Sequence, residues 1–242
     1  MTFSMTEIIP AILEKTFKDV SMRLDQTAGL VQTAQIDICD GVFVPSTTWP
    51  FISPAQYDKT LNMDEAYKRI VSTEDEMPHW EDFDFELDLM VADAKRLLPD
   101  FLALGPSRVI FHAEAFKDLN NDVRDVVKLL PEMVEPAIAI NADTNPEILF
   151  LLLDEKIIKS VQCMGIAKIG YQGQPFDERV ITNLKTLRAR YPELPLSVDG
   201  SVTLETAPRL VEAGANRLAS GSGIFATDDI AERISSFKNI LL

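Results

Sequence analysis

Short apolar segments alternate with longer amphipathic segments along almost the whole chain. The apolar segments are rich in Val, Ile and Ala and bounded by turn residues, as is typical of buried parallel strands. Eight strands are expected, at Ile8–Leu13, Gln32–Ile38, Phe83–Met90, Arg108–Ala113, Pro136–Asn141, Ser160–Ala167, Leu196–Asp199 and Arg217–Ala219.

The amphipathic segments between these strands predict helices. Helix-end signals agree, because Asn145-Pro146 places proline in a first turn and Gly214 follows an apolar helical run. The expected helices are Thr16–Ala28, Asp93–Leu104, Leu119–Leu130, Pro146–Asp154, Glu178–Tyr191, Thr203–Ala213 and Asp228–Asn239.

Strands that alternate with helices through short connections favour a parallel sheet with right-handed crossovers. Eight such units in 242 residues predict an α/β fold, a (β/α)8 TIM barrel that forms a single domain over residues 1–242. The connection at about 44–82 is unusually long, and a short helix is expected in it at Asp64–Val71. Connections of this length are usually lids, binding loops or oligomer contacts.

Two of the predicted strands lead to an Asp that is followed closely by glycine, in Gln35–Gly41 and in Leu196–Ser201. In a closed barrel the carboxyl ends of all strands share one mouth, so Asp37 and Asp199 would meet there as an acid/base pair. An enzyme is therefore expected. The alternative for each Asp is a cap on the helix or loop that follows it.

Composition limits the classes of molecule that the protein is expected to bind. The chain has 23 Lys and Arg against 38 Asp and Glu, a formal net charge of −15, which disfavours nucleic acid and anionic membranes. Only two cysteines occur, the first residues show no secretory signal, and the longest apolar run, Ile148–Leu153, is too short to cross a bilayer. We expect a soluble, cytoplasmic protein with no nucleic-acid or membrane partner.

Eight segments, taken in chain order, carry motifs of one known family. They are Ile9–Leu13, Gln35–Pro45, Asp88–Val91, Phe111–Ala115, Ala139–Asn141, Gly170–Phe176, Val198–Val202 and Ala219–Phe225. Together they resemble the ribulose-phosphate 3-epimerases and related sugar-phosphate epimerases over nearly the whole chain. The resemblance implies a (β/α)8 barrel that inverts a carbon next to a ketone, with Asp37 and Asp199 as the acid/base pair.

The resemblance also implies a divalent metal held by two His and the two Asp, but both His positions differ here, as Gln35 and Asp88. The resulting set, Gln35, Asp37, Asp88 and Asp199, offers only oxygen atoms, which suits Mg, Mn or another hard cation. Without a metal, the clustered carboxylates would raise at least one pKa, and that Asp would serve as a protonated general acid. A third possibility is a barrel that has lost its chemistry and only binds ligand.

A phosphate site is expected where the last strands end. Small residues and a short helix after the eighth strand would let backbone N–H groups approach an anion there, and the alternative is ordinary strand-to-helix turns. The candidate binding residues are Gly170, Gly173, Gly200, Ser201, Gly221, Ser222, Lys168 and Asn141.

Lys168 has three interpretations: a phosphate contact, a solvated loop lysine, or a Schiff-base amine as in some class I aldolases of this fold. His112 is expected to be a hydrogen-bonded barrel histidine, and His79 is a weaker candidate for a substitute metal ligand. Asp40 is expected to hold the turn before Gly41, and Cys39 is not expected to be a nucleophile.

The sequence thus predicts a ketose-phosphate 3-epimerase of the ribulose 5-phosphate/xylulose 5-phosphate type, an isomerase of carbohydrate metabolism. Its partners are expected to be a small phosphorylated sugar and further copies of itself in a homo-oligomer. The alternatives are an inactive sugar-phosphate-binding barrel and a lysine-dependent aldolase that uses Lys168.

Overall fold

All eight predicted strands are present, parallel, and arranged as a closed barrel in chain order, which confirms the (β/α)8 prediction. The computed structural model describes residues 6–240, so the prediction about a secretory signal rests partly on residues outside the described range. The strands are β1 Glu7–Ile12, β2 Thr33–Cys39, β3 Asp84–Met90, β4 Arg108–His112, β5 Glu135–Ile140, β6 Ser160–Met164, β7 Leu196–Asp199 and β8 Arg217–Ser220.

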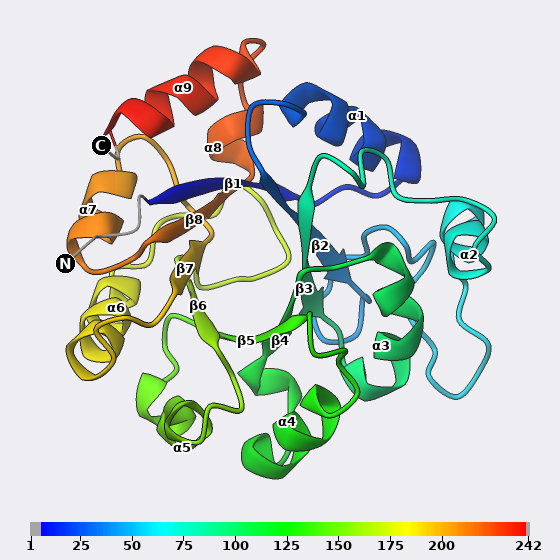
Figure 1. Ribbon diagram of the computed structural model, residues 1–242, viewed down its shortest axis with the longest axis horizontal. Coiled ribbons are helices and arrows are strands. Elements are labelled where there is room, and N and C mark those ends of the chain that lie inside the picture. Colours follow the sequence, from blue (N-terminus) through cyan, green and yellow to red (C-terminus); the bar gives the residue numbers. More distant parts are fainter. Residues whose placement is uncertain (1–5, 241–242) are drawn as a thin grey trace. The chain divides into compact units, whose positions relative to one another are not determined.

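The helices follow the predicted pattern, with short helices in the loops (Figure 1). In the part of the chain described, no helix has the combination of length and apolar character that crossing a bilayer requires. The helices are α1 Phe17–Thr27, α2 Glu65–Val71, α3 Ala94–Phe101, η1 Leu102–Leu104, η2 Ala113–Ala115, α4 Leu119–Val127, η3 Pro146–Leu149, α5 Phe150–Asp154, α6 Arg179–Arg190, α7 Ala207–Glu212, α8 Ser222–Phe225 and α9 Ile230–Ile240.

Three predicted boundaries are wrong by three residues or more. Helix α4 ends at Val127 instead of Leu130, because the N–H groups of Leu129 and Leu130 bond to carbonyls three residues back. The sixth strand ends at Met164 instead of Ala167, because Gly165 lies against the chain after β7, where an added Cβ would be 2.2 Å from the Gly200 carbonyl oxygen. Helix α7 begins at Ala207 instead of Thr203. The backbone N–H of Thr203 donates to the Thr206 hydroxyl at 2.9 Å, and that of Thr206 to the Thr203 hydroxyl at 3.2 Å, so these residues form a turn before the helix.

The chain forms two compact units, residues 12–136 and residues 1–11 with 137–242. In the first, β3 lies between β2 and β4, and α2, α3 and α4 lie outside these strands (Figure 1). In the second, β5, β6, β7, β8 and β1 pair in that order. Every residue of β2 is buried, as expected for a strand inside an α/β barrel.

The long connection after β2 packs onto its own unit through aromatic side chains. Trp49 and Tyr67 have ring centroids 6.1 Å apart, and Tyr67 in α2 meets Phe101 in α3 at 5.9 Å. Phe51 lies 6.4 Å from Phe101, whose side chain is completely buried. Phe101 therefore fastens both the connection and α2 to α3.

Replacing Phe101 by Ala should lower the free energy of unfolding by about 3–5 kcal/mol, because it leaves a cavity among these rings. Met133→Ala is the control, since Met133 is 87% exposed and its loss should change stability by less than about 0.5 kcal/mol. Urea unfolding measures both. Equal effects of the two substitutions would show that the cluster does not hold the connection.

Candidate active site

Near the end of β2, Gln35 and Asp37 point to the same side of the strand, because side chains two residues apart share a face. Gln35 Nε2 donates a hydrogen bond of 2.8 Å to Asp37 Oδ1. Gln35 is fully buried and Asp37 is 6% exposed. The predicted catalytic carboxylate therefore has a fixed orientation, and the amide that holds it stands where the family resemblance implies an imidazole.

Asp88 lies beside Asp37, since the two are partners in the β2–β3 register. The Nε2 atom of His112 in β4 is 2.8 Å from Asp88 Oδ1, and both side chains are fully buried. His112 and Asp88 thus form a buried hydrogen-bonded pair. This contact agrees with the prediction that His112 is a hydrogen-bonded barrel histidine, and sequence reasoning missed its partner.

His79 lies at the other end of β3 and does not approach Asp88. Its Nε2 is 2.7 Å from Asp25 Oδ1 and its Nδ1 is 3.2 Å from Asp82 Oδ2, just before the strand begins. Hydrogen bonds to Asp25 and Asp82 raise the pKa of His79. The suggestion that His79 replaces a metal ligand is wrong, because its ring faces two carboxylates at the opposite end of the strand.

Two further residues around the end of β2 behave as the sequence predicted. Asp40 Oδ1 accepts hydrogen bonds from the backbone N–H groups of Val42 and Phe43, both at 2.8 Å, which forms the expected turn. Burial, followed by the charge of Asp37, raises the pKa of the Cys39 thiol well above its usual value. A protonated, buried thiol is a poor nucleophile.

In the second unit, Asp199 is the last residue of β7 and is 8% exposed. Its backbone carbonyl accepts the N–H of Gly165 at 2.7 Å, which fixes the strand end. The next two residues have left-handed backbones, with φ +92° at Gly200 and φ +53° at Ser201. A left-handed Ser is uncommon, and here the Ser201 hydroxyl donates to the Gln174 carbonyl, which holds the turn.

The turn after β8 is crowded by protein atoms. A Cβ at Gly223 would lie 2.2 Å from the Val202 carbonyl oxygen, and one at Gly221 would lie 2.8 Å from Gln172 Nε2. Close packing thus accounts for Gly223 without a ligand. The sequence did not indicate the position of Gln172, whose side-chain amide lies against Gly221 at the end of β8.

The other predicted binding residues lie in loops. Gly170 and Gly173 have left-handed backbones, with φ +82° and +70°, in the loop after β6. Lys168 is exposed and lies beyond the end of β6, so it is not a strand residue. Asn141 is half-buried directly after β5, and the neighbouring Ala142 carbonyl accepts a 3.1 Å hydrogen bond from Asn183 Nδ2.

The donor atoms present fit a hard divalent cation better than a borderline metal. Gln35, Asp37, Asp88 and Asp199 contribute amide and carboxylate oxygens, the ligands that Mg²⁺ and Mn²⁺ prefer. His112 Nε2 is hydrogen-bonded to Asp88, an arrangement in which an imidazole orients a carboxylate.

Comparison with known proteins identifies relatives over nearly the whole chain. The model of the "Ribulose-phosphate 3 epimerase family" matches residues 68–225. The ribulose-phosphate 3-epimerase of Eremothecium gossypii is 30% identical, with 96% of this chain and 91% of that protein covered. That of Bacillus subtilis is 27% identical, with 97% and 99% covered.

Solved structures show the same fold at lower identity. A 3-hexulose-6-phosphate synthase aligns with a TM-score of 0.66 at 17% identity, covering 97% of this chain and 99% of that one. The 3-keto-L-gulonate-6-phosphate decarboxylase from Vibrio cholerae aligns with a TM-score of 0.67 at 14% identity and covers 98% of both chains.

His112 and His79 allow a matched test of how much a buried histidine–carboxylate contact contributes to stability compared with an exposed one. His112→Phe should lower the free energy of unfolding by about 2–3 kcal/mol, because a buried carboxylate loses a charged hydrogen bond. His79→Gln changes an exposed ion pair and should cost less than about 1 kcal/mol. Chemical unfolding at pH 7 compares them, and equal costs would contradict the buried pairing.

The pH dependence of the His79 effect has a definite sign. The folded pKa of His79 is raised, so its contribution is fully present below the unfolded pKa of about 6.5 and is lost as the pH rises through the folded value. The stability difference between wild type and His79→Gln should therefore shrink from pH 5.5 to pH 9. A difference that grows over this range would refute the pairing with Asp25 and Asp82.

Proposed function

The chain belongs to the ribulose-phosphate 3-epimerase family, and on this basis we propose that it is a ketose-phosphate 3-epimerase of the ribulose 5-phosphate/xylulose 5-phosphate type. One observation carries the proposal: both acid/base positions implied by the family, Asp37 and Asp199, are retained and buried near strand ends. Barrel enzymes place their catalytic groups at these ends.

In the proposed reaction, one of these carboxylates removes the proton from the carbon next to the substrate ketone, and the carboxyl group of the other returns a proton to the opposite face. The negative charge moves onto the ketone oxygen between the two steps. Gln35 supports this role, because its hydrogen bond to one oxygen of Asp37 leaves the carboxylate in a defined orientation for proton transfer.

Asp37, Asp88 and Asp199, with the Gln35 amide oxygen, would hold a hard cation such as Mg²⁺ or Mn²⁺ in this proposal. When bound, the cation would stabilise the negative charge that develops on substrate oxygens. In the metal-free version, one of the carboxyl groups stays protonated and acts as the general acid, and His112 remains hydrogen-bonded to Asp88.

The proposed substrate is a small phosphorylated sugar. Its phosphate would lie at Gly200, Ser201, Gly221 and Ser222, which follow the ends of β7 and β8 and would offer it backbone N–H groups. The loop with Gly170, Gly173 and Gln172 would cover it, with Asn141 and Lys168 at its edge. The support is the position of Gln172 Nε2 against Gly221 and the bond from Ser201 to Gln174.

A second candidate, a barrel that binds sugar phosphates without turnover, is favoured by one observation. Neither family histidine is present, since Gln35 and Asp88 occupy their positions. The aldolase alternative receives no such support, because Lys168 is exposed and lies beyond its strand.

The proposal predicts that the protein exchanges the C3 proton of D-ribulose 5-phosphate with deuterium from heavy water, as followed by NMR. Asp37→Asn and Asp199→Asn should each slow this exchange by about 10²–10⁴-fold, since each removes an acid/base group. Asp154→Asn is the control, because Asp154 is a surface carboxylate bonded to Tyr191 and Arg190, and it should not change the rate. Binding of ribulose 5-phosphate without any exchange would favour the second candidate.

The metal proposal predicts that purified protein, stripped with a chelator and dialysed against equal Mg²⁺, Mn²⁺ and Zn²⁺, retains Mg²⁺ or Mn²⁺ at about one ion per chain. Asp88→Asn should weaken retention at least about tenfold, because it replaces a carboxylate ligand. Elemental analysis provides the readout independently of activity. Selective retention of Zn²⁺, or full exchange activity without metal, would rule out the hard-cation site.

A further inference from the structure

The connection after β2 folds back along the strand that carries Asp37. The Thr48 hydroxyl donates to the Asp37 carbonyl at 2.7 Å and accepts the N–H of Cys39 at 2.8 Å. Further along, the N–H of Ala55 donates to the Asp40 carbonyl at 2.8 Å. The backbone around Asp37 is therefore bonded directly to this connection, and its geometry depends on where the connection lies.

One buried carboxylate joins three segments at this end of the unit. Besides the turn at Val42 and Phe43, Asp40 accepts the Tyr57 hydroxyl at 2.6 Å and the N–H of Ala92 at 2.7 Å, both through Oδ2. Ala92 lies just after β3, the strand of Asp88. Asp40 thus connects the turn after β2, the long connection and the loop after β3.

Tyr57 is the only one of these donors that comes from a side chain. Burial and the hydrogen bond to Asp40 raise the pKa of its phenol, so the group remains a hydrogen-bond donor at physiological pH. The Tyr57 hydroxyl belongs to the long connection itself, whereas the three N–H groups belong to backbone that directly follows β2 and β3. Tyr57 is therefore the side chain by which the connection holds the Asp40 carboxylate, while the Ala55 N–H holds the Asp40 backbone carbonyl.

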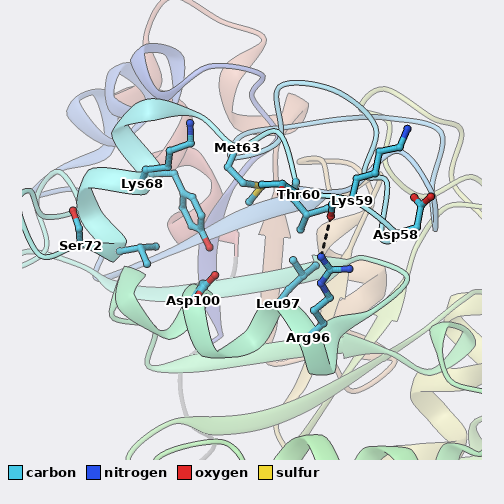
Figure 2. A pocket seen from close by; sticks show the side chains of 12 residues that line it. Asp58, Lys59, Thr60, Met63, Lys68, Ser72, Arg96, Leu97 and Asp100 are labelled. Atoms are coloured by element: carbon cyan, nitrogen blue, oxygen red, sulfur yellow. Dashed lines mark hydrogen bonds between the residues drawn. The ribbon is translucent and has the colours of Figure 1, made fainter.

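Arg96 in α3 holds Tyr57 in turn. Its guanidinium donates to the Tyr57 carbonyl and, at 3.1 Å, to the Lys59 carbonyl, and it lies 5.6 Å from the centre of the Tyr57 ring. Figure 2 shows Arg96 reaching from α3 to the connection beside a cavity of about 860 Å³. Arg96 and Lys59 both line this cavity, and the hydrogen bond between them joins α3 to the connection.

We propose that Tyr57 and Arg96 are positioning residues that, through Asp40, keep the ends of β2 and β3 in the arrangement that the reaction requires. This inference rests on the proposed function. The residues lie away from the proposed acid/base groups, and they act by fixing the backbone that carries Asp37 and the loop that follows Asp88. Small displacements of such groups have large effects on rate, because proton transfer needs reacting atoms in contact.

The test begins with Tyr57→Phe, which removes a single oxygen atom. We expect kcat for the C3 exchange to fall by about 10–100-fold with KM changed less than about threefold, because the misplaced group acts in the chemical step. Tyr191→Phe is the matched control, since its hydroxyl donates to Asp154 at 2.8 Å on the surface, and it should keep wild-type kcat.

Arg96 is tested by a conservative pair of variants. Arg96→Met removes both carbonyl contacts and should reproduce the loss seen in Tyr57→Phe, whereas Arg96→Lys keeps the charge and one hydrogen bond and should restore at least half of kcat. An Arg96→Lys variant no better than Arg96→Met would overturn the role of Arg96. A Tyr57→Phe variant that is no longer folded at the assay temperature would overturn the positioning role.

Amide hydrogen exchange gives a readout that does not need catalysis. Residues 41–62 should exchange at least tenfold faster in Tyr57→Phe and Arg96→Met, with α6 and α9 unchanged. If the wild type shows no activity on pentulose phosphates, the proposed function fails while this measurement still decides whether Tyr57 and Arg96 hold the connection. If Tyr57→Phe showed both wild-type amide exchange rates over residues 41–62 and wild-type kcat for the C3 exchange, the inference would be refuted.

Discussion

A carboxylate buried at the end of a parallel strand must be given hydrogen-bond donors, because an unpaired buried charge is costly. This constraint explains much of the structure around β2 and β3. Gln35 donates to Asp37, His112 pairs with Asp88, and Asp40 receives two backbone N–H groups at one oxygen and the Tyr57 hydroxyl and the Ala92 N–H at the other. These hydrogen-bond donors thus determine the orientation of the three carboxylates, and the surrounding strands and loops hold the donors in place.

The need to pair buried carboxylates also explains the two positions, 35 and 88, at which the chain departs from the family pattern. An imidazole at position 35 could ligate a borderline metal, whereas the Gln35 amide orients Asp37 through a hydrogen bond. Position 88 carries a carboxylate, and His112 in the neighbouring strand β4 forms a hydrogen bond with it. Gln35 and Asp88 therefore belong to a hydrogen-bonded, buried polar cluster near the ends of β2 and β3.

The sequence was sufficient to predict the barrel, because eight buried strands carry a period and composition that helices do not share. The positions of Asp37 and Asp199 near strand ends were also predictable, since each is followed within a few residues by glycine, and their catalytic role stays a prediction. Contacts between distant residues were not. The pairing of His112 with Asp88 depends on the β3–β4 register, and the bonds from Tyr57 to Asp40 and from Arg96 to Lys59 depend on the path of an irregular connection. The late start of α7 had a local signal, two threonines three residues apart, which helical periodicity obscured.

The central claim is that Asp37 and Asp199 face the same substrate carbon from opposite sides. A crystal structure of the protein with bound D-ribulose 5-phosphate tests it most directly. The account predicts one carboxylate on each face of C3, each within about 3.5 Å of that carbon, the range of a near-attack geometry. A complex in which both carboxylates lie on one face, or in which either points away from the sugar, would contradict it.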